Sequence, residues 1–195
     1  MSLPLSNTTS DALNWDEAMS LIHRLYRDRN YTISLLIATG CFTGLRISDI
    51  LTLRYSDLFS PEFEIREKKT KKLRVVRVNR DLRSHAEQCF KALHLKDPSR
   101  KAFISRKGTI FTVQRVNVIL KQLKSRYGLK VGHFSTHSFR KTFGRRVVEM
   151  AGPENAEMQL IKLSELFSHV SVKTTRIYLS LRKDELLETY DLLSM

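Results

Sequence analysis

The segment "YTISLLIATGCF", residues 31–42, places the strongest constraint on the fold because it is apolar on almost every side. A helix that is hydrophobic all round is buried, so other elements must surround this one. No apolar run in the chain approaches the ~18 residues that a membrane span needs, and no secretory signal opens it. Hydrophobic residues make up 42% of the 195 residues, which is enough for one domain core around this helix.

The flanking sequence indicates a mostly helical domain. Residues 1–13 are polar and aperiodic and are predicted to form a flexible tail, whereas an apolar stripe begins after Asn14. Gly40 and Gly44 are predicted to flank a turn that leads into a short helix in "LRISDILTL". Further helices are expected at about 81–95, from Thr112, after Gly132, and at 154–167, 171–181 and 183–193.

The middle of the chain changes to the period of β-strands. Phe63 and Ile65 alternate with charged residues, and "LRVVRV" is rich in β-branched residues. The lysine-rich "EKKTKK" lies between these segments, so residues 62–78 are predicted to form a hairpin. "YSDLF" before Pro61 is a candidate third strand, and another short strand is expected around Phe103. The predicted fold class is α+β, mostly α with a small antiparallel β-sheet.

The charge of the chain indicates its partner. Thirty-four Lys and Arg residues against 20 Asp and Glu residues give a net charge of +14. Such an excess favours a polyanion, most simply nucleic acid, although a surplus that serves only solubility remains an alternative. The sequence shows no lipidation motif and no amphipathic helix with a purely basic polar face, so a membrane is not an expected partner. Cys41 and Cys89 have no disulfide-framework spacing, which is typical of free thiols in a reducing cytoplasm.

Several familiar kinds of chemistry lack their motifs here. The sequence contains neither G-x-x-x-x-G-K-[ST] nor G-x-G-x-x-G, so nucleotide-driven chemistry is not expected. His133 and His137 have the spacing of zinc ligands but lack the glutamate of H-E-x-x-H, and the acidic residues form no cluster for two metal ions. We therefore expect no metal and no cofactor, so any catalysis must depend on side chains. His23, His85 and His94 have no companions and are expected at the surface.

Two short motifs each carry a weak signal. In "THSFRKTF", His137 and Arg140 are three residues apart, which makes them neighbours on one face of a helix. In "TGLRISD", Arg46 follows a glycine turn and Asp49 comes one helical turn later. Taken alone, the first pair is explained by a solvated helix face. The second is explained by an ion pair that contributes about 0.2–0.5 kcal/mol.

The segment "SHVSVKTTRIYLSL" contains a third motif, in which Tyr178 follows His169 by nine positions. On one straight helix, nine steps of ~100° would place the two side chains on opposite faces. If they act together, the helix must break between them, and Ser171 is a suitable N-cap for a new helix. A lone tyrosine in such a stretch is otherwise most simply a packed aromatic residue.

Taken in order, these motifs resemble the catalytic domain of the tyrosine recombinases, the phage-integrase family. The resemblance covers residues 14–195 and consists of G-L-R-x-S-[DE], a hairpin K-T pair, H-x-x-R, a late histidine and a tyrosine nine positions further on. Ser168, where the family often has glycine, and Arg77, where it often has proline, depart from the pattern at positions that are not catalytic. The residues that match the family's catalytic positions are Arg46, Lys69, His137, Arg140, His169 and Tyr178, with Asp49 at its usual acidic position.

The resemblance implies that Tyr178 attacks a DNA phosphodiester, leaving a 3′-phosphotyrosine and a free 5′-hydroxyl. A phenol, with a pKa of about 10, leaves more readily than a sugar hydroxyl, so the linkage can be attacked again. The bond energy is retained in this linkage, and rejoining requires neither ATP nor a metal. The implied function is site-specific recombination or integration of DNA.

The resemblance also implies roles for the other matched residues. Arg46 and Arg140 would hold the non-bridging phosphate oxygens, since guanidinium groups match two such oxygens at once. His137 and His169 would donate hydrogen bonds to the same phosphate, and His137 could accept the phenol proton. Lys69 could protonate the departing 5′ oxygen.

The hairpin lysines allow a second interpretation. Lys68, Lys71 and Lys72 crowd the tip around Lys69, so all four could instead form a general phosphate-binding surface. We predict DNA contacts for Lys68, Lys71, Lys72 and Lys141.

Double-stranded DNA is the expected partner, and the resemblance implies self-association as a tetramer on DNA. The C-terminal helix, with Leu186, Leu187, Tyr190 and Leu193 on one face, would either dock on a neighbouring subunit or pack on its own domain. Family members usually carry an N-terminal DNA-grasping domain, which we expect to be absent because only about thirteen residues precede the first helix. A cytoplasmic, nucleoid-associated protein is expected. Two alternatives remain open: a type IB topoisomerase, and a non-catalytic basic module that binds DNA or RNA.

Overall fold

The computed structural model describes residues 10–105 and 107–181. The chain divides into two compact units, residues 1–143 and 144–195. The first unit contains the following elements in chain order: α1 (Trp15–Arg27), α2 (Tyr31–Thr43), α3 (Ile47–Ile50), α4 (Tyr55–Phe59), β1 (Glu62–Arg66), β2 (Leu73–Arg77), α5 (Arg80–Ala92) and α6 (Val113–Tyr127). Helix α7 (Thr136–Phe167) begins in the first unit and ends in the second, which also contains α8 (Val172–Leu179).

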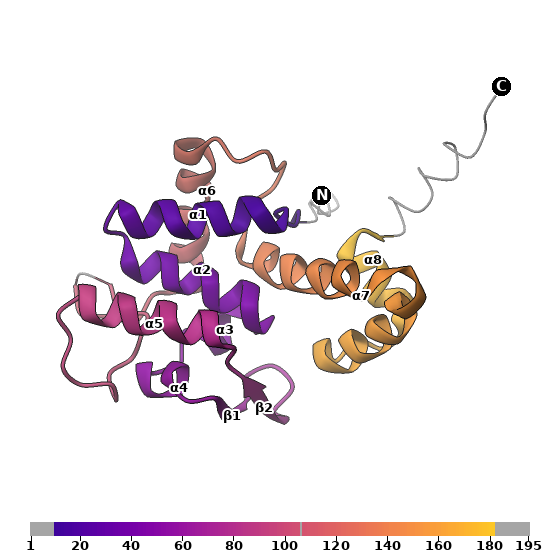
Figure 1. Cartoon of the computed structure of the whole chain (residues 1–195), viewed down its shortest axis with the longest axis horizontal. Coiled ribbons are helices and arrows are strands. Elements are labelled where there is room, and N and C mark those ends of the chain that lie inside the picture. Colours follow the sequence, from indigo (N-terminus) through magenta and orange to yellow (C-terminus); the bar gives the residue numbers. More distant parts are fainter. Residues whose placement is uncertain (1–9, 106, 182–195) are drawn as a thin grey trace, which may run out of the picture. The chain divides into compact units, whose positions relative to one another are not determined.

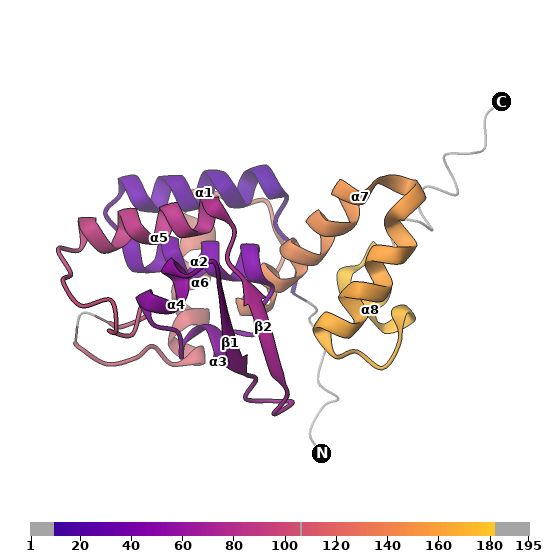
Figure 2. The same cartoon turned by 60° about the horizontal axis from the view of Figure 1, so that its bottom comes forward.

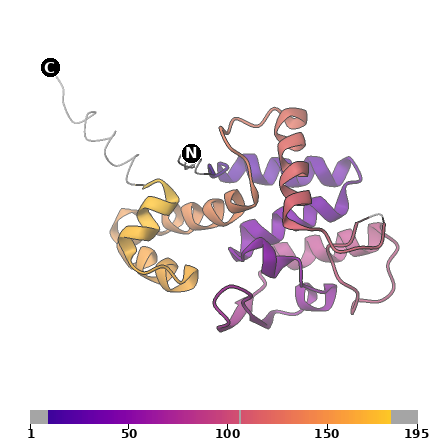
Figure 3. The same ribbon diagram turned by 180° about the vertical axis from the view of Figure 1, so that it is seen from behind.

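Helix α2 is the centre of the first unit, as its apolar sequence predicts. Ten of its residues are buried, and it contacts α1 and α5 (Figure 1). Helix α6 crosses α1 on the reverse side (Figure 3), where Arg24 Nη1 donates to the carbonyl oxygen of Tyr127 at 3.2 Å. Asn14 caps α1 and Thr112 caps α6, both through side-chain oxygens that accept backbone N–H groups.

Gly40 and Gly44 have different roles, and the prediction that they flank one turn was wrong. Gly40 lies inside α2, where a Cβ atom would come within 2.6 Å of Phe139 Cβ, so the missing side chain allows close packing. Gly44 ends α2 with φ at 60°, a left-handed conformation that glycine adopts without strain.

The predicted hairpin is confirmed, and its register determines which side chains are buried. Strands β1 and β2 pair antiparallel, with Phe63 opposite Val76 and Ile65 opposite Arg74, and the hairpin projects from the helices (Figure 2). Residues that face each other across such a pair lie on one side of the sheet. Ile65 and Val76 are buried on this side, so Arg74 is drawn into the protein and needs a partner there.

Two predicted strands are not formed. "YSDLF" is helix α4, in which Tyr55 and Leu58 are buried on one face and Asp57 accepts the backbone N–H of Arg54 at 2.7 Å. The region near Phe103 makes isolated bridges between Arg54 and Lys101 and between Ile104 and Ile110. Within the described residues, the sheet therefore has two strands.

The helices of the second unit are interrupted at two places, near Gly152 and before Ser171. Helix α7 is interrupted at Gly152, where φ is 70° and ψ is 169°, and Pro153 follows. Ser171 is the N-cap of α8 and accepts the N–H of Thr174 at 3.2 Å, as predicted. The helix predicted at 183–193 lies outside the described residues. None of the helices that the structure describes has the length and hydrophobicity to cross a membrane.

Candidate active site

The two arginines of the predicted site meet the turn that ends α2 in different ways. Arg46 immediately precedes α3, two residues after the left-handed Gly44. Arg140, on the first turns of α7, donates from Nη1 to the carbonyl oxygen of Gly44 at 2.6 Å. The side chain of Arg140 is buried, whereas that of Arg46 is 18% exposed. The turn therefore carries Arg46 and binds Arg140, a residue that is far away in the sequence.

His137 lies among the same positive charges. The pKa of His137 is lowered first because the surrounding protein removes part of its hydration, and then by the charges of Arg140, Lys141, Lys69 and Arg46. The residue is nevertheless exposed to solvent. A histidine in this environment is neutral near pH 7 and can accept a proton. We call Arg46, Lys69, His137 and Arg140 the cationic cluster.

Lys69 is the hairpin lysine whose charge lowers the pKa of His137. The residue lies between two neighbours that are held in place. The backbone N–H of Lys68 donates to Asp49 Oδ1 at 2.9 Å, and the hydroxyl of Thr70 donates to Glu67 Oε2 at 2.6 Å. Asp49 is fully buried and contacts the hairpin backbone; its supporting role in the reaction stays a prediction.

Sequence reasoning missed Glu67 and Arg74. Glu67 Oε2 accepts from Arg46 Nη1 at 2.7 Å, and Glu67 Oε1 lies 3.5 Å from Arg74 Nη1. Arg74 Nη2 also donates to the carbonyl oxygen of Thr43 at 2.9 Å. The register of the hairpin could have indicated Arg74, because it places an arginine on the buried face and a buried charge requires a partner.

The remaining predicted DNA contacts differ in exposure. Lys68, Lys71 and Lys72 are exposed around the hairpin tip, where Lys71 has φ at 59°. Lys141 is buried, so its ammonium group is less open to a partner than those of the hairpin. The assignment of all four as DNA contacts stays a prediction.

In the second unit, the break between helices brings His169 and Tyr178 together. Their ring centroids are 5.1 Å apart, and Phe167 contacts both rings. His169 Nδ1 lies 2.9 Å from the hydroxyl of the buried Thr175, and its backbone N–H donates to the carbonyl oxygen of Ser164 at 2.9 Å. His169 and Tyr178, nine positions apart in the sequence, are therefore in direct contact.

Ser168 shows why the family often has glycine at this position. Its φ is 52°, in the left-handed region that glycine adopts at lower cost than other residues. The serine therefore carries some backbone strain where α7 ends.

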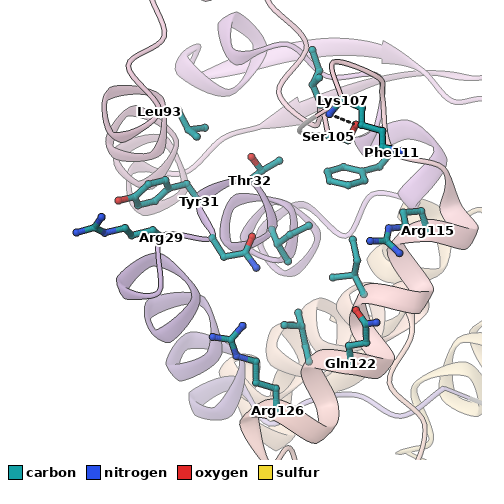
Figure 4. Close-up of a pocket in the computed structure, with 15 residues that line it drawn as sticks. Arg29, Tyr31, Thr32, Leu93, Ser105, Lys107, Phe111, Arg115, Gln122 and Arg126 are labelled. Atoms are coloured by element: carbon teal, nitrogen blue, oxygen red, sulfur yellow. Dashed lines mark hydrogen bonds between the residues drawn. The ribbon is translucent and has the colours of Figure 1, made fainter.

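A pocket beside the α1–α2 turn does not coincide with these residues. It has a volume of about 930 Å³ and lies near the α1–α2 turn and α6. Figure 4 shows Arg29, Arg115 and Arg126 around this pocket, and its lining includes none of the predicted site residues. The phosphates of duplex DNA lie on the outside of the double helix, so a protein can reach them without an enclosed pocket.

Three histidines outside the predicted site were expected at the surface. His23 and His94 are exposed as expected, but the surface prediction for His85 was wrong: its Nε2 atom lies 2.9 Å from Ser34 Oγ between α2 and α5. Among the described residues, no three His, Cys, Asp or Glu side chains gather as metal ligands would.

Comparisons with known proteins agree with the motifs. The model of the phage integrase family matches residues 12–185. The tyrosine recombinase XerH of Campylobacter jejuni subsp. jejuni serotype O:2 is 28% identical over 165 residues, which cover 81% of this chain and 44% of that protein. The chain thus spans less than half the length of this relative.

Solved structures show the same fold. The structure of XerA recombinase superposes with a TM-score of 0.71 at 22% identity, covering 98% of this chain and 66% of that one. A XerH recombinase bound to its difH substrate gives a TM-score of 0.64 at 22% identity, covering 93% of this chain and 53% of that one. The mostly helical fold with a small two-stranded antiparallel sheet is therefore that of a tyrosine recombinase catalytic domain.

Proposed function

The chain belongs to the phage integrase family, and we propose that it cuts and rejoins double-stranded DNA at a specific site through a covalent bond to Tyr178. The observation that supports this most directly is the cationic cluster. Arg46, Lys69 and Arg140 come from three separate segments of the chain, and their charges act on the ring of His137. Such an arrangement is suited to a phosphate group that gains negative charge during a reaction.

The proposed reaction starts with attack of Tyr178 Oη on the phosphorus atom. The phenol proton passes to His137, whose lowered pKa leaves the ring neutral and able to accept it. The bond between phosphorus and the 5′ oxygen breaks, and Lys69 donates a proton to that oxygen. The products are a 3′-phosphotyrosine and a free 5′-hydroxyl, and the reverse steps rejoin the strand.

Arg46 and Arg140 stabilise the five-coordinate phosphorus in this proposal. Each guanidinium group carries a permanent charge and can donate two hydrogen bonds to phosphate oxygens. Transition-state arginines in other phosphoryl transfers contribute ~10³–10⁵ in rate. These fixed cations would provide the positive charge that a metal ion provides in other nucleases, so the proposed reaction needs neither a metal nor ATP.

His169 belongs to the same proposal through its contact with Tyr178. The hydrogen bond between His169 and Thr175 fixes the ring, so that Nε2 is the nitrogen that can reach a phosphate oxygen. Self-association on DNA through the C-terminal segment, which lies outside the described residues, and action in the cytoplasm at the nucleoid complete the proposal.

The test uses duplex DNA with a nick close to the cleavage point, which traps the covalent intermediate because the short strand diffuses away. The target sequence is found by offering a randomised library of such duplexes, capturing protein-bound DNA after denaturation, and sequencing it. We expect a denaturation-resistant adduct with the natural chain and none with Tyr178→Phe, which should still bind DNA. Tyr31→Phe is the matched control, since Tyr31 lies outside the predicted site.

Other outcomes would favour the alternatives. Relaxation of supercoiled plasmid without exchange of strands between duplexes would indicate a type IB topoisomerase. DNA binding with no adduct from any sequence in the library would indicate a non-catalytic module and would refute the proposal.

A further inference from the structure

We propose that Glu67 is a positioning residue that holds Arg46 and the Lys69 loop in their working arrangement. This inference rests on the proposed function, because it assigns Glu67 a part in the same reaction. The residue lies at the start of the hairpin tip, and its side chain is 3% exposed.

One carboxylate connects three side chains. Glu67 Oε2 accepts from Arg46 Nη1 at 2.7 Å and from the Thr70 hydroxyl at 2.6 Å. Glu67 Oε1 lies 3.5 Å from Arg74 Nη1. Arg46 belongs to the turn after α2, whereas Thr70 immediately follows Lys69. A single side chain therefore links the segment that carries the first arginine to the loop that carries the lysine.

The carboxylate is ionised in this position. Burial by itself raises the pKa of Glu67, but hydrogen bonds from Thr70 and Arg46 and the charges of Arg46 and Arg74 outweigh burial and hold the pKa below its usual value. A buried carboxylate with such partners is fixed in both charge and direction. Arg46 thus has a permanent, immobile acceptor.

An alternative is that Glu67 only occupies Arg46 until a phosphate displaces it. The backbone argues against displacement. Glu67 accepts the N–H of Lys71 at 2.9 Å and donates its own N–H to the carbonyl oxygen of Lys72 at 3.0 Å. Arg74 is also held at the carbonyl oxygen of Thr43. Because Glu67 has two further side-chain partners and a fixed backbone, we expect it to stay in place when a phosphate binds to Arg46.

Asp49 supports the same loop from the other side. It accepts the backbone N–H of Lys68, so both neighbours of Lys69 are tied to carboxylates, Lys68 to Asp49 and Thr70 to Glu67. Asp49 holds the backbone of the loop, and Glu67 joins the loop to Arg46. The second connection is the one that makes the position of the arginine depend on the hairpin.

The first experiment measures adduct formation in a single turnover with Glu67→Ala and Glu67→Gln. A misplaced catalytic group lowers a rate by about 10–100-fold, and we expect this loss for Glu67→Ala with little change in DNA affinity. Glu67→Gln keeps the length and an acceptor oxygen, so it should recover part of the rate. Glu64→Gln is the matched control, because Glu64 is an exposed acidic residue of the same hairpin and should behave as the natural chain.

A second substrate separates positioning from folding. A methylphosphonate at the cleavage point replaces a charged non-bridging oxygen with a methyl group, which lessens the need for an arginine. If Glu67 acts through Arg46, the defect of Glu67→Ala should shrink markedly on this substrate. An equal defect on both substrates, or full activity of Glu67→Ala on the ordinary one, would overturn the inference. Thr70→Val, which removes one hydrogen bond at constant size, serves if the Glu67 variants do not fold.

An experiment without DNA distinguishes this inference from the proposed function. The Nε–H signal of Arg46 in nitrogen-15 NMR, assigned with Arg46→Lys, should be sharp in the natural chain and broadened or averaged in Glu67→Ala. A natural chain that forms no adduct would refute the proposed function, while this signal would still test Glu67. An Arg46 signal unchanged by Glu67→Ala would overturn the inference.

Discussion

At the scale of single residues, the sequence motifs identified charges, and the structure shows what neutralises them. Arg46, His137 and Arg140 were predicted because each stands in a motif with recognisable spacing. Glu67 lies in a lysine-rich segment and belongs to no motif with a fixed spacing, so nothing in the sequence distinguishes it from a glutamate at the surface. Its importance depends on burial and on two arginines that the fold brings to it.

His85 is a residue whose neutral form the fold requires. Burial lowers its pKa to about 4, with a smaller contribution from His23, and Ser34 Oγ and Cys89 Sγ lie 2.9 and 3.6 Å from its Nε2 atom. Protonation would place a charge between α2 and α5. The unfolded chain, with the ordinary histidine value of 6.5, binds this proton more readily than the folded one.

The folded state should therefore lose stability as the pH falls from 6.5 towards 4, and retain this contribution in full above 6.5. Between pH 7.5 and 5 the expected loss in free energy of unfolding due to His85 is about 2 kcal/mol. Urea unfolding at several pH values measures it. His85→Gln cannot titrate, so its curve should be flatter over this range. Parallel curves for both proteins would contradict the assignment.

At the scale of elements, long periodic segments were predictable and short ones were not. Each of two long helices keeps one pattern throughout: α2 is apolar all round over 13 residues, and α6 carries an apolar stripe over 15 residues. "YSDLF" has only five residues, with aromatic side chains that favour strands, and its helical form depends on tertiary packing of Tyr55 and Leu58. Gly40 was assigned to a turn because glycine usually marks one, whereas its position depends on a residue 99 positions later, Phe139.

The packing of α2 against the start of α7 should make Gly40→Ala destabilising. The added Cβ would meet Phe139 Cβ at 2.6 Å, and such overpacking costs about 1–3 kcal/mol. Gly128→Ala provides the contrast, because φ there is 63° but no heavy atom lies within 4 Å of the new Cβ. Its cost should be backbone strain alone, roughly 1–2 kcal/mol.

Phe139→Gly removes the three atoms that a Cβ at position 40 would meet, so this replacement should cost less stability in Gly40→Ala than in Gly128→Ala. Thermal unfolding of the two single and two double variants measures this difference. A Gly40→Ala protein as stable as the natural chain would show that α2 and α7 can move apart without cost.

At the scale of the whole molecule, the charge of +14 is a property of the composition, and the structure shows where part of it is presented. Lys68, Lys71 and Lys72 are exposed on a hairpin that projects from the helices (Figure 2). The sequence predicted this tip from the change of period. It could not predict that the tip is tied to Asp49 and Glu67, since those contacts depend on how α3 and the hairpin pack.

If the hairpin contacts phosphates, the salt dependence of DNA binding should report it. Each phosphate contact contributes about −0.9 to the slope of log K against log salt. Replacing Lys68, Lys71 and Lys72 with alanine should therefore reduce the magnitude of the slope by roughly 3 if each makes one contact. Lys69 is left in place, so that the loss concerns binding and not the proposed chemistry. Fluorescence anisotropy with a duplex at several salt concentrations measures the slope.

The matched control replaces three other exposed lysines, Lys91, Lys96 and Lys121, with alanine. Both triple variants carry a net charge of +11, which is 14 minus 3, so a general attraction between protein and DNA falls equally in both. A smaller slope confined to the hairpin variant would locate phosphate contacts at the tip. Equal slopes for the two variants would mean that the basic composition acts as a diffuse charge. The hairpin would then have no special part in binding, and its lysines other than Lys69 would contribute no more than those elsewhere on the surface.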